Sequence, residues 1–192
     1  MTEANTRQRA ARTDKRRNRS HILGVAERYF TEHGVSESMN AIAKLAGVGP
    51  GTLYRHFPNR DALLAALLQA RSDELKARRD AIRREVHDST AALAQWLEAL
   101  GHWATAFDGL PEPLRLALNE GSSPLALTCQ GYVTITDEFL SAAQHDGGAR
   151  PTVRGKDLFL NVLAISWVRE AALADETSGG ALEDIMRAGW AT

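Results

Sequence analysis

The chain has 192 residues and a formal net charge of −1, with 44% hydrophobic and 24% charged residues. This composition indicates a folded, water-soluble protein and excludes an intrinsically disordered one, because disordered chains lack the apolar residues to build a core. No apolar stretch approaches the ~18 residues of a membrane-spanning helix. The single cysteine, Cys129, excludes an internal disulfide. We therefore expect a cytoplasmic protein with no membrane partner.

The net charge conceals a difference between the two ends of the chain. Residues 1–60 hold 11 Lys and Arg against 5 Asp and Glu, whereas residues 61–192 hold 12 against 19. A basic N-terminal part joined to an acidic body predicts that only the N-terminal part contacts a polyanion.

The N-terminal residues predict an arm followed by a helix. Residues 1–12 are polar and lack a period, so we interpret them as a flexible basic arm. A helix is predicted to begin near Thr13 and to stop at Gly34, which tolerates the left-handed conformation of a helix end. Its apolar face comprises Ile22, Ala26, Tyr29 and Phe30.

Capping residues and prolines define the next three helices. Ser38 is a good N-cap for a second helix, and Pro50 suits the first position of a short third helix. Pro58 ends that helix because proline disfavours helical geometry in the residue before it. Asn59 caps a fourth helix, which is predicted to run to about Val86.

The rest of the chain also reads as helical, because apolar residues recur at three- and four-residue spacings. One helix is predicted to begin near Ser89, and three more cover about Pro113–Asn119, Pro124–Gln144 and Gly155–Ala174. A last short helix follows Gly179-Gly180 and ends near Trp190. No alternating pattern of useful length predicts a strand. The fold class is therefore all-α.

The spacing of three residues indicates a helix-turn-helix. Ala43 is small enough for a helix crossing, Gly47 tolerates a positive φ in the turn, and Leu53 locks the following helix onto the preceding one. The alternative interpretation is two short packed helices with a glycine turn. The third helix favours DNA binding, because its inner residues leave an outer face of hydrogen-bonding side chains. This face comprises Thr52, Tyr54, Arg55 and His56.

Residues 16–68 resemble the DNA-binding domain of the TetR (tetracycline-repressor-type) transcriptional regulators. The resemblance is carried by Ile22–Val35, Ser38–Ala43, Ala46–Val48 and Gly51–Leu63. It implies a helix-turn-helix DNA-binding domain over residues 13–60 and a helical ligand-binding and dimerisation domain over residues 61–192.

The resemblance also assigns residues to DNA. These are Ser38, Asn40, Pro50, Gly51, Thr52, Tyr54, His56 and Arg60. Tyr54 and His56 match positions that hold operator phosphates. Arg60 stands where the family usually has lysine, so a guanidinium fork replaces a point charge. Gly49 replaces a common serine and caps the third helix less well than serine does.

Aromatic residues of the C-terminal part suggest a mostly apolar pocket for an unknown small-molecule effector. The candidate pocket residues are Trp96, His102, Trp103, Phe107, Tyr132 and Trp167. Glu98 and His102 have metal-ligand spacing, but no third ligand lies nearby, so we expect no metal and no cofactor. The helices over about Pro124–Gln144 and Gly155–Ala174 are the expected dimer contacts.

Together these features predict a homodimeric, ligand-responsive regulator that binds a near-palindromic double-stranded DNA operator. A repressor is the favoured form, although activation depends on operator position and stays open. The protein is not expected to be an enzyme. The rival hypothesis is a helical ligand-binding or enzymatic domain whose basic head docks on RNA or another acidic partner. That hypothesis predicts no preference for two-fold-symmetric DNA.

Overall fold

The computed structural model describes residues 3–119, 123–170 and 178–192. Its helices are α1 (Glu3–His33), α2 (Met39–Leu45), α3 (Pro50–His56), α4 (Arg60–Glu85), α5 (Ser89–Ala104), α6 (Pro111–Ala117), α7 (Pro124–His145), α8 (Gly155–Glu170) and α9 (Ser178–Trp190). An isolated β-bridge between Ala149 and Ala191 is the only strand-like pairing in these ranges. The predicted all-α fold is confirmed.

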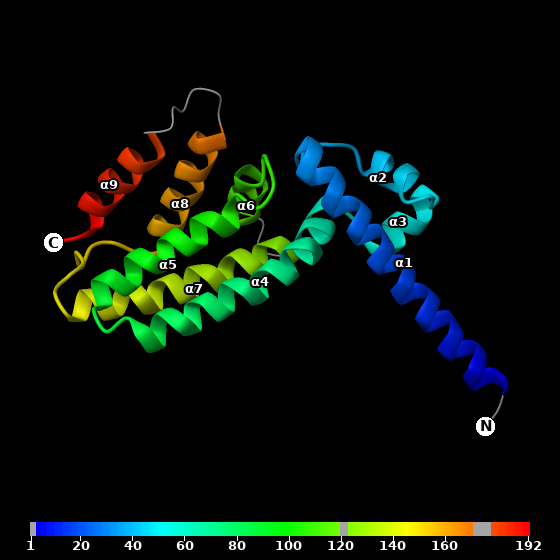
Figure 1. The fold of residues 1–192 in the computed structure, drawn as a ribbon, viewed down its shortest axis with the longest axis horizontal. Helices are drawn as coiled ribbons and strands as arrows, with labels where there is room; N and C mark the ends of the chain where they lie inside the picture. The colour runs from blue at the N-terminus through cyan, green and yellow to red at the C-terminus, as the bar shows by residue number, and fades with distance from the viewer. Residues whose placement is uncertain (1–2, 120–122, 171–177) are drawn as a thin grey trace.

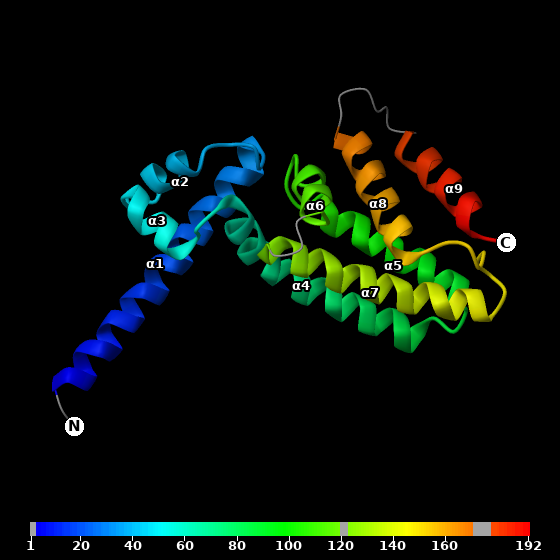
Figure 2. The same cartoon turned by 180° about the vertical axis from the view of Figure 1, so that it is seen from behind.

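The helices form two units joined by α4 (Figure 1). The first unit consists of α1, α2 and α3, and the N-terminal turns of α1 project away from it (Figures 1 and 2). In the second unit α4, α5 and α7 lie alongside one another, with α8 packed against α5, α6 and α7. Helix α9 packs on α8 at the outside of this unit. Within the described ranges, none of the helices is both long and apolar enough to span a bilayer.

Local capping explains several of the helix boundaries. The Ser38 hydroxyl accepts a hydrogen bond from the Asn40 amide at 3.2 Å and caps α2, as predicted. The Asn59 side chain accepts from the Ala62 amide at 2.8 Å and caps α4. Gly34 follows α1 with φ of +80°, the left-handed conformation that its position required.

Two helix starts differ from the prediction. Helix α1 begins at Glu3 and not near Thr13, so residues 3–12 of the predicted arm have a helical backbone. This segment is rich in Ala and Arg, which favour helices, but it has no apolar face from which a period could be read. Helix α9 begins at Ser178 and contains the Gly179-Gly180 pair, which was predicted to precede it. Residues 171–174 of the helix predicted to Ala174 lie outside the described residues.

The core of the second unit is aromatic. Trp96 is fully buried, its indole N–H donates to the buried Thr136 hydroxyl at 2.9 Å, and its ring stacks on Phe139 with centroids 5.5 Å apart. Satisfying the indole N–H lets a large ring enter the core without a desolvation penalty. This packing fixes α5 against α7.

The two units meet where α1 ends and the turn after α5 begins. The Val35 amide donates to the Asp108 carbonyl at 2.9 Å. Beside this bond, the Phe30 and Phe107 rings meet edge to face with centroids 6.5 Å apart. The loop between α1 and α2 therefore rests on the turn between α5 and α6.

Candidate nucleic-acid interface

Buried residues hold α3 against α2 in a helix-turn-helix. Leu53 and Phe57, on the inner side of α3, are 0% and 1% exposed. Gly47 adopts φ of +63° in the turn, and the Val48 amide donates to the Ala43 carbonyl at 3.0 Å. The geometry predicted from the spacing of Ala43, Gly47 and Leu53 is confirmed, and it turns the other side of α3 outward.

The outer side of α3 carries hydrogen-bonding groups that the core does not use. Tyr54 is 42% exposed, and Pro50 and Gly51 are exposed at the N-terminal end of the helix. Arg55 lies along the helix, where its Nε donates to the Gly51 carbonyl and a terminal nitrogen donates to the Thr52 hydroxyl, both at 3.1 Å. Arg55 and Thr52 thus form one polar surface with Tyr54.

The start of each short helix is held differently. The N-cap of α3 is Gly49, which has no side chain to accept a capping hydrogen bond, so only its backbone caps the helix. Ser38 and Asn40 are exposed at the start of α2, but the Ser38 hydroxyl is already an acceptor in the cap. Its proton stays available to an outside acceptor such as a phosphate oxygen.

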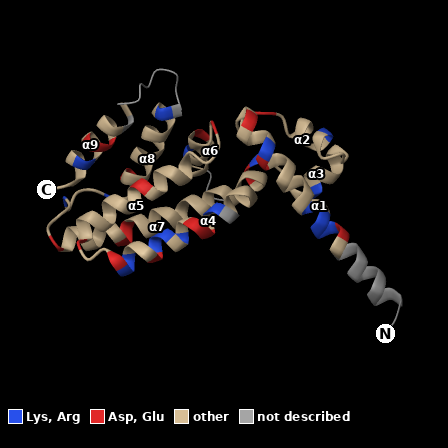
Figure 3. Ribbon diagram, in the orientation of Figure 1, with Lys and Arg blue, Asp and Glu red and all other residues tan. Residues whose placement is uncertain are grey.

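Cations gather around His56 at the end of α3. Burial lowers the pKa of the half-buried His56, and the positive charges of Lys15, Arg19 and Arg55 lower this pKa further. The Arg19 guanidinium lies 5.1 Å from the centroid of the Phe57 ring, which places α1 charge beside α3. Figure 3 shows Lys and Arg on the part of α1 beside α3. The region has the positive field that a polyanion requires.

Arg60 is occupied by contacts within the chain. Its two terminal nitrogens donate to the Val35 and Glu37 carbonyls, each at 2.8 Å. These contacts tie the start of α4 to the loop between α1 and α2. The resemblance had assigned Arg60 to DNA. Sequence reasoning did not find this brace, because the two carbonyls lie 25 and 23 residues upstream.

The structure brings together most, but not all, of the predicted pocket residues. The centroid of the Tyr132 ring lies 6.2 Å from that of Trp96 and 4.7 Å from that of Trp103, and Phe107 is buried in the turn that follows α5. His102 is exposed on α5. Trp167 is separate from this cluster, because it lies 58% exposed on α8. Its sequence neighbours do not reveal this orientation, since α8 is apolar on several sides.

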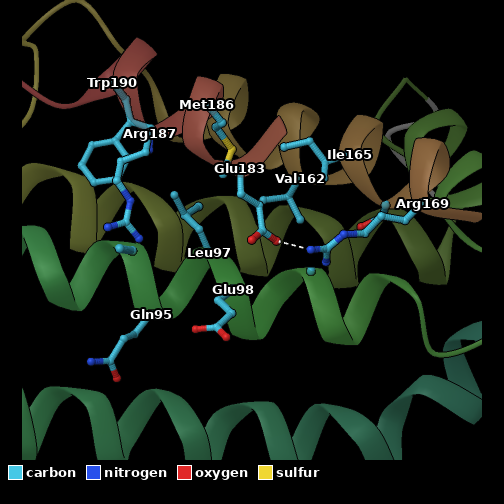
Figure 4. Close-up of a pocket in the computed structure, with 13 residues that line it drawn as sticks. Gln95, Leu97, Glu98, Val162, Ile165, Arg169, Glu183, Met186, Arg187 and Trp190 are labelled. Carbon is cyan, nitrogen blue, oxygen red and sulfur yellow. Dashed lines mark ion pairs between the residues drawn. The ribbon is translucent and has the colours of Figure 1, made fainter. Parts of the chain in front are cut away.

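A cavity of about 120 Å³ lies between α5, α8 and α9 (Figure 4). The Arg169 and Glu183 side chains form an ion pair across it at 2.8 Å. Arg187 and Glu98 also line it, so its two arginines face two glutamates. Sequence analysis missed this cavity, because the contribution of α9 depends on tertiary packing. No group of three or more His, Cys, Asp or Glu suited to a metal occurs in the described part of the chain.

Helices α8 and α9 leave an apolar face uncovered. Trp167 on α8 and Ile185 on α9 are 58% and 68% exposed. Ile185 lines a groove of about 440 Å³ between α8 and α9, whereas Trp167 lines a neighbouring groove of about 260 Å³ between α6 and α8. Large exposed apolar patches mark protein interfaces. The sequence predicted that α8 and the helix over Pro124–Gln144 both contact their copies in a dimer. Within one chain, most of the apolar face of the latter helix, α7, packs on α4, α5 and α8.

Comparison with known protein families finds a match for each of the two units. Residues 22–67 match the family of bacterial regulatory proteins named tetR, and residues 88–191 match the C-terminal domain of SbtR-like transcriptional regulators. The second match alone covers more than half of the chain. The protein belongs to the TetR family of transcriptional regulators. The resemblance read from Ser38–Ala43 and Gly51–Leu63 is thereby confirmed.

Individual TetR-family and helix-turn-helix regulators are similar over different extents. An HTH-type transcriptional regulator of Staphylococcus aureus (strain USA300) is 36% identical over 90 residues, which are 46% of this chain and 49% of the relative. The match therefore spans about half the length of such curated relatives. The crystal structure of a TetR regulator from Streptomyces coelicolor is 29% identical with a TM-score of 0.54, covering 90% of this chain and 98% of that one.

A more distant structure shares the fold alone. FadR from Bacillus subtilis, solved in complex with stearoyl-CoA, is 20% identical with a TM-score of 0.60. The alignment covers 88% of this chain and 98% of FadR. The two-unit arrangement thus persists at low sequence identity.

Proposed function

We propose that this TetR-family protein is a homodimeric repressor that binds a near-palindromic DNA operator and leaves it when a small molecule binds the C-terminal unit. The observation that carries the proposal is the outer side of α3. Its hydrogen-bonding residues are held rigidly by buried Leu53 and Phe57, next to the cations of α1. Rigid donors in a positive field suit both phosphates and base edges.

The proposed DNA contacts divide by chemistry. Tyr54 and His56 bind phosphates, while the N-terminal turn of α3, from Pro50 to Thr52, faces the major groove. Ser38 and Asn40 approach the backbone from the start of α2. Arg60 supports these contacts indirectly, because it fixes the loop that leads into α2.

A dimer is needed because α3 has only seven residues. One such helix makes few contacts, so two copies must bind the same duplex together to gain affinity. The uncovered face of α8 and α9, including Trp167 and Ile185, supplies the proposed two-fold interface. The two recognition helices then enter successive major grooves about 34 Å apart.

Ligand response follows if the effector favours a different separation of the two α3 helices. A hundredfold loss of operator affinity requires about 2.7 kcal/mol of differential binding, within the usual range of allosteric coupling. FadR, which shares this fold and was solved in complex with stearoyl-CoA, supports a small-molecule effector.

Selection from random duplex DNA tests the proposal. We expect the protein to enrich a two-fold-symmetric site, and Arg55→Gln to lower the affinity for that site and reduce its salt slope by about one. Arg84→Gln is the matched control, since Arg84 lies exposed at the far end of α4. Enrichment of no duplex, or preference for RNA over every duplex, would refute the proposal and favour the rival hypothesis.

A further inference from the structure

A groove of about 290 Å³ runs along the outside of the second unit, between α4 and α5. Its walls combine charged residues with the apolar surfaces of Leu75, Ala99 and Trp103. The charged and titratable residues on it are Arg71, Glu74, Arg78 and His102. The groove thus offers two permanent cations against one carboxylate.

Arg71 is the unusual member of this set. It is half-buried on α4, with its guanidinium 5.3 Å from the centroid of the Phe107 ring. Its Nε is shielded from solvent and has no hydrogen-bond acceptor. Among the residues whose side chains the structure describes, no carboxylate forms an ion pair with Arg71, although Glu74 is only three residues away. Holding a cation in this way costs free energy, which the contact with the Phe107 ring offsets only in part.

Trp103 lies in the opposite wall, on α5. It is only 4% exposed, and its indole N–H has no acceptor, whereas the Trp96 indole N–H is bonded to Thr136. On α4, the same side as Arg71, a terminal nitrogen of Arg78 donates to the Gln95 side-chain oxygen at 3.2 Å. Arg71 is therefore the cation of this groove that has neither a carboxylate nor an amide partner among the described side chains.

We propose that this groove binds a small organic anion, with a carboxylate on the Arg71 guanidinium and an apolar part against Leu75, Ala99 and Trp103. A planar guanidinium binds a carboxylate with two parallel hydrogen bonds, which gives both charge and shape recognition. The inference names the ligand class for the proposed function and rests on that function for its regulatory meaning. The cavity of Figure 4 is a poorer anion site, because its two arginines face two glutamates.

The position of Arg71 connects such an anion to the first unit. Arg71 lies on Phe107, and Phe107 meets Phe30 of α1. The next residue, Asp108, accepts the hydrogen bond from Val35 in the loop before α2. A ligand that moves the Arg71 side chain therefore disturbs the contact on which the helix-turn-helix rests.

Calorimetric titration of the full chain tests the site. The probes are benzoate and hexanoate, each compared with its neutral amide. We expect the carboxylates to bind and the amides to bind at least tenfold more weakly. Arg71→Gln should weaken carboxylate binding by about tenfold to a hundredfold, the range for hydrogen bonds to charged groups. Arg84→Gln on the same helix should leave it unchanged.

Two further variants keep the test decisive. Glu74→Gln should strengthen carboxylate binding, because it removes the one negative side chain of the groove. If Arg71→Gln does not fold, Arg71→Lys keeps the charge but loses the fork and should still weaken binding. The inference is overturned if neither carboxylate binds, if the amides bind equally well, or if the Arg71 variants bind as the parent does. Duplex binding without ligand, measured separately, distinguishes these failures from failure of the proposed function.

Discussion

Replacing Arg60 with alanine removes two hydrogen bonds that hold the α1–α2 loop on α4. Each joins a terminal guanidinium nitrogen to a backbone carbonyl at 2.8 Å, at Val35 and at Glu37. A hydrogen bond to a charged group contributes about 1.5–3 kcal/mol, but these carbonyls are only part-buried and regain water when the fork is lost. We therefore expect the loop to lose about 2 kcal/mol of local stability.

Hydrogen exchange measures this loss where it occurs. A local opening free energy reduced by about 2 kcal/mol speeds amide exchange by about thirtyfold, and we expect this over residues 34–40. Arg60→Lys should exchange at an intermediate rate, because an ammonium keeps the charge without the fork. Arg115→Ala is the control. The Arg115 fork bonds an exposed carboxylate of Glu112 in the same helix, and such exposed pairs contribute little.

The salt dependence of operator binding provides the opposing test. If Arg60 acts only as a brace, Arg60→Ala lowers operator affinity but leaves the salt slope unchanged, because no phosphate contact is lost. Unchanged exchange over residues 34–40, combined with a salt slope reduced by about one, would show that Arg60 binds phosphate. That result would refute the role assigned from its two carbonyl contacts.

Further predictions concern titration, reactivity, strain and assembly. A DNA phosphate beside His56 favours the protonated imidazole, so operator affinity should rise as the pH falls from about 8 to about 6. His56→Gln should abolish this pH dependence. Equal affinities of the parent protein at both pH values would contradict the prediction. Burial raises the pKa of the Cys129 thiol to about 12. Iodoacetamide at about pH 8 should therefore alkylate the folded protein about a thousandfold more slowly than the unfolded chain, and comparable rates would refute this. Gly34→Ala forces a non-glycine residue to φ of +80° with its Cβ 3.2 Å from Asp108 oxygens, and should lower the melting temperature by about 2–8 °C. Ile185→Glu places a charge on the α8–α9 face and should shift the protein from dimer to monomer in light scattering, whereas a persistent dimer would place the interface elsewhere.

Features that depend on a few neighbouring residues could be predicted from the sequence. Ser38 and Asn59 cap their helices through side chains that reach only two or three residues along the chain. Gly34 and Gly47 take positive φ because the local turn geometry demands it. The helix-turn-helix belongs to this class, and its residues form one short continuous segment.

Features that depend on distant residues could not be predicted. The carbonyl partners of Arg60 lie in another loop, and the exposure of Trp167 depends on which side of α8 meets α5, α6 and α7. Helix α1 was predicted too short because a helix without an apolar face gives no period. The groove at Arg71 needs α4 and α5 side by side, which no local pattern indicates.

The C-terminal end of α9 is tied to the loop before α8. At its C-terminal end, Arg150 donates to the carbonyls of Ala188, Trp190 and Ala191, and Thr192 bonds back to Gly147 and Gly148. Toward its N-terminal end, the Arg169–Glu183 ion pair is partly exposed to solvent. The last turn of α9 and the loop between α7 and α8 are consequently coupled. A substitution at Arg150 should therefore also loosen Trp190, which lines the cavity of Figure 4.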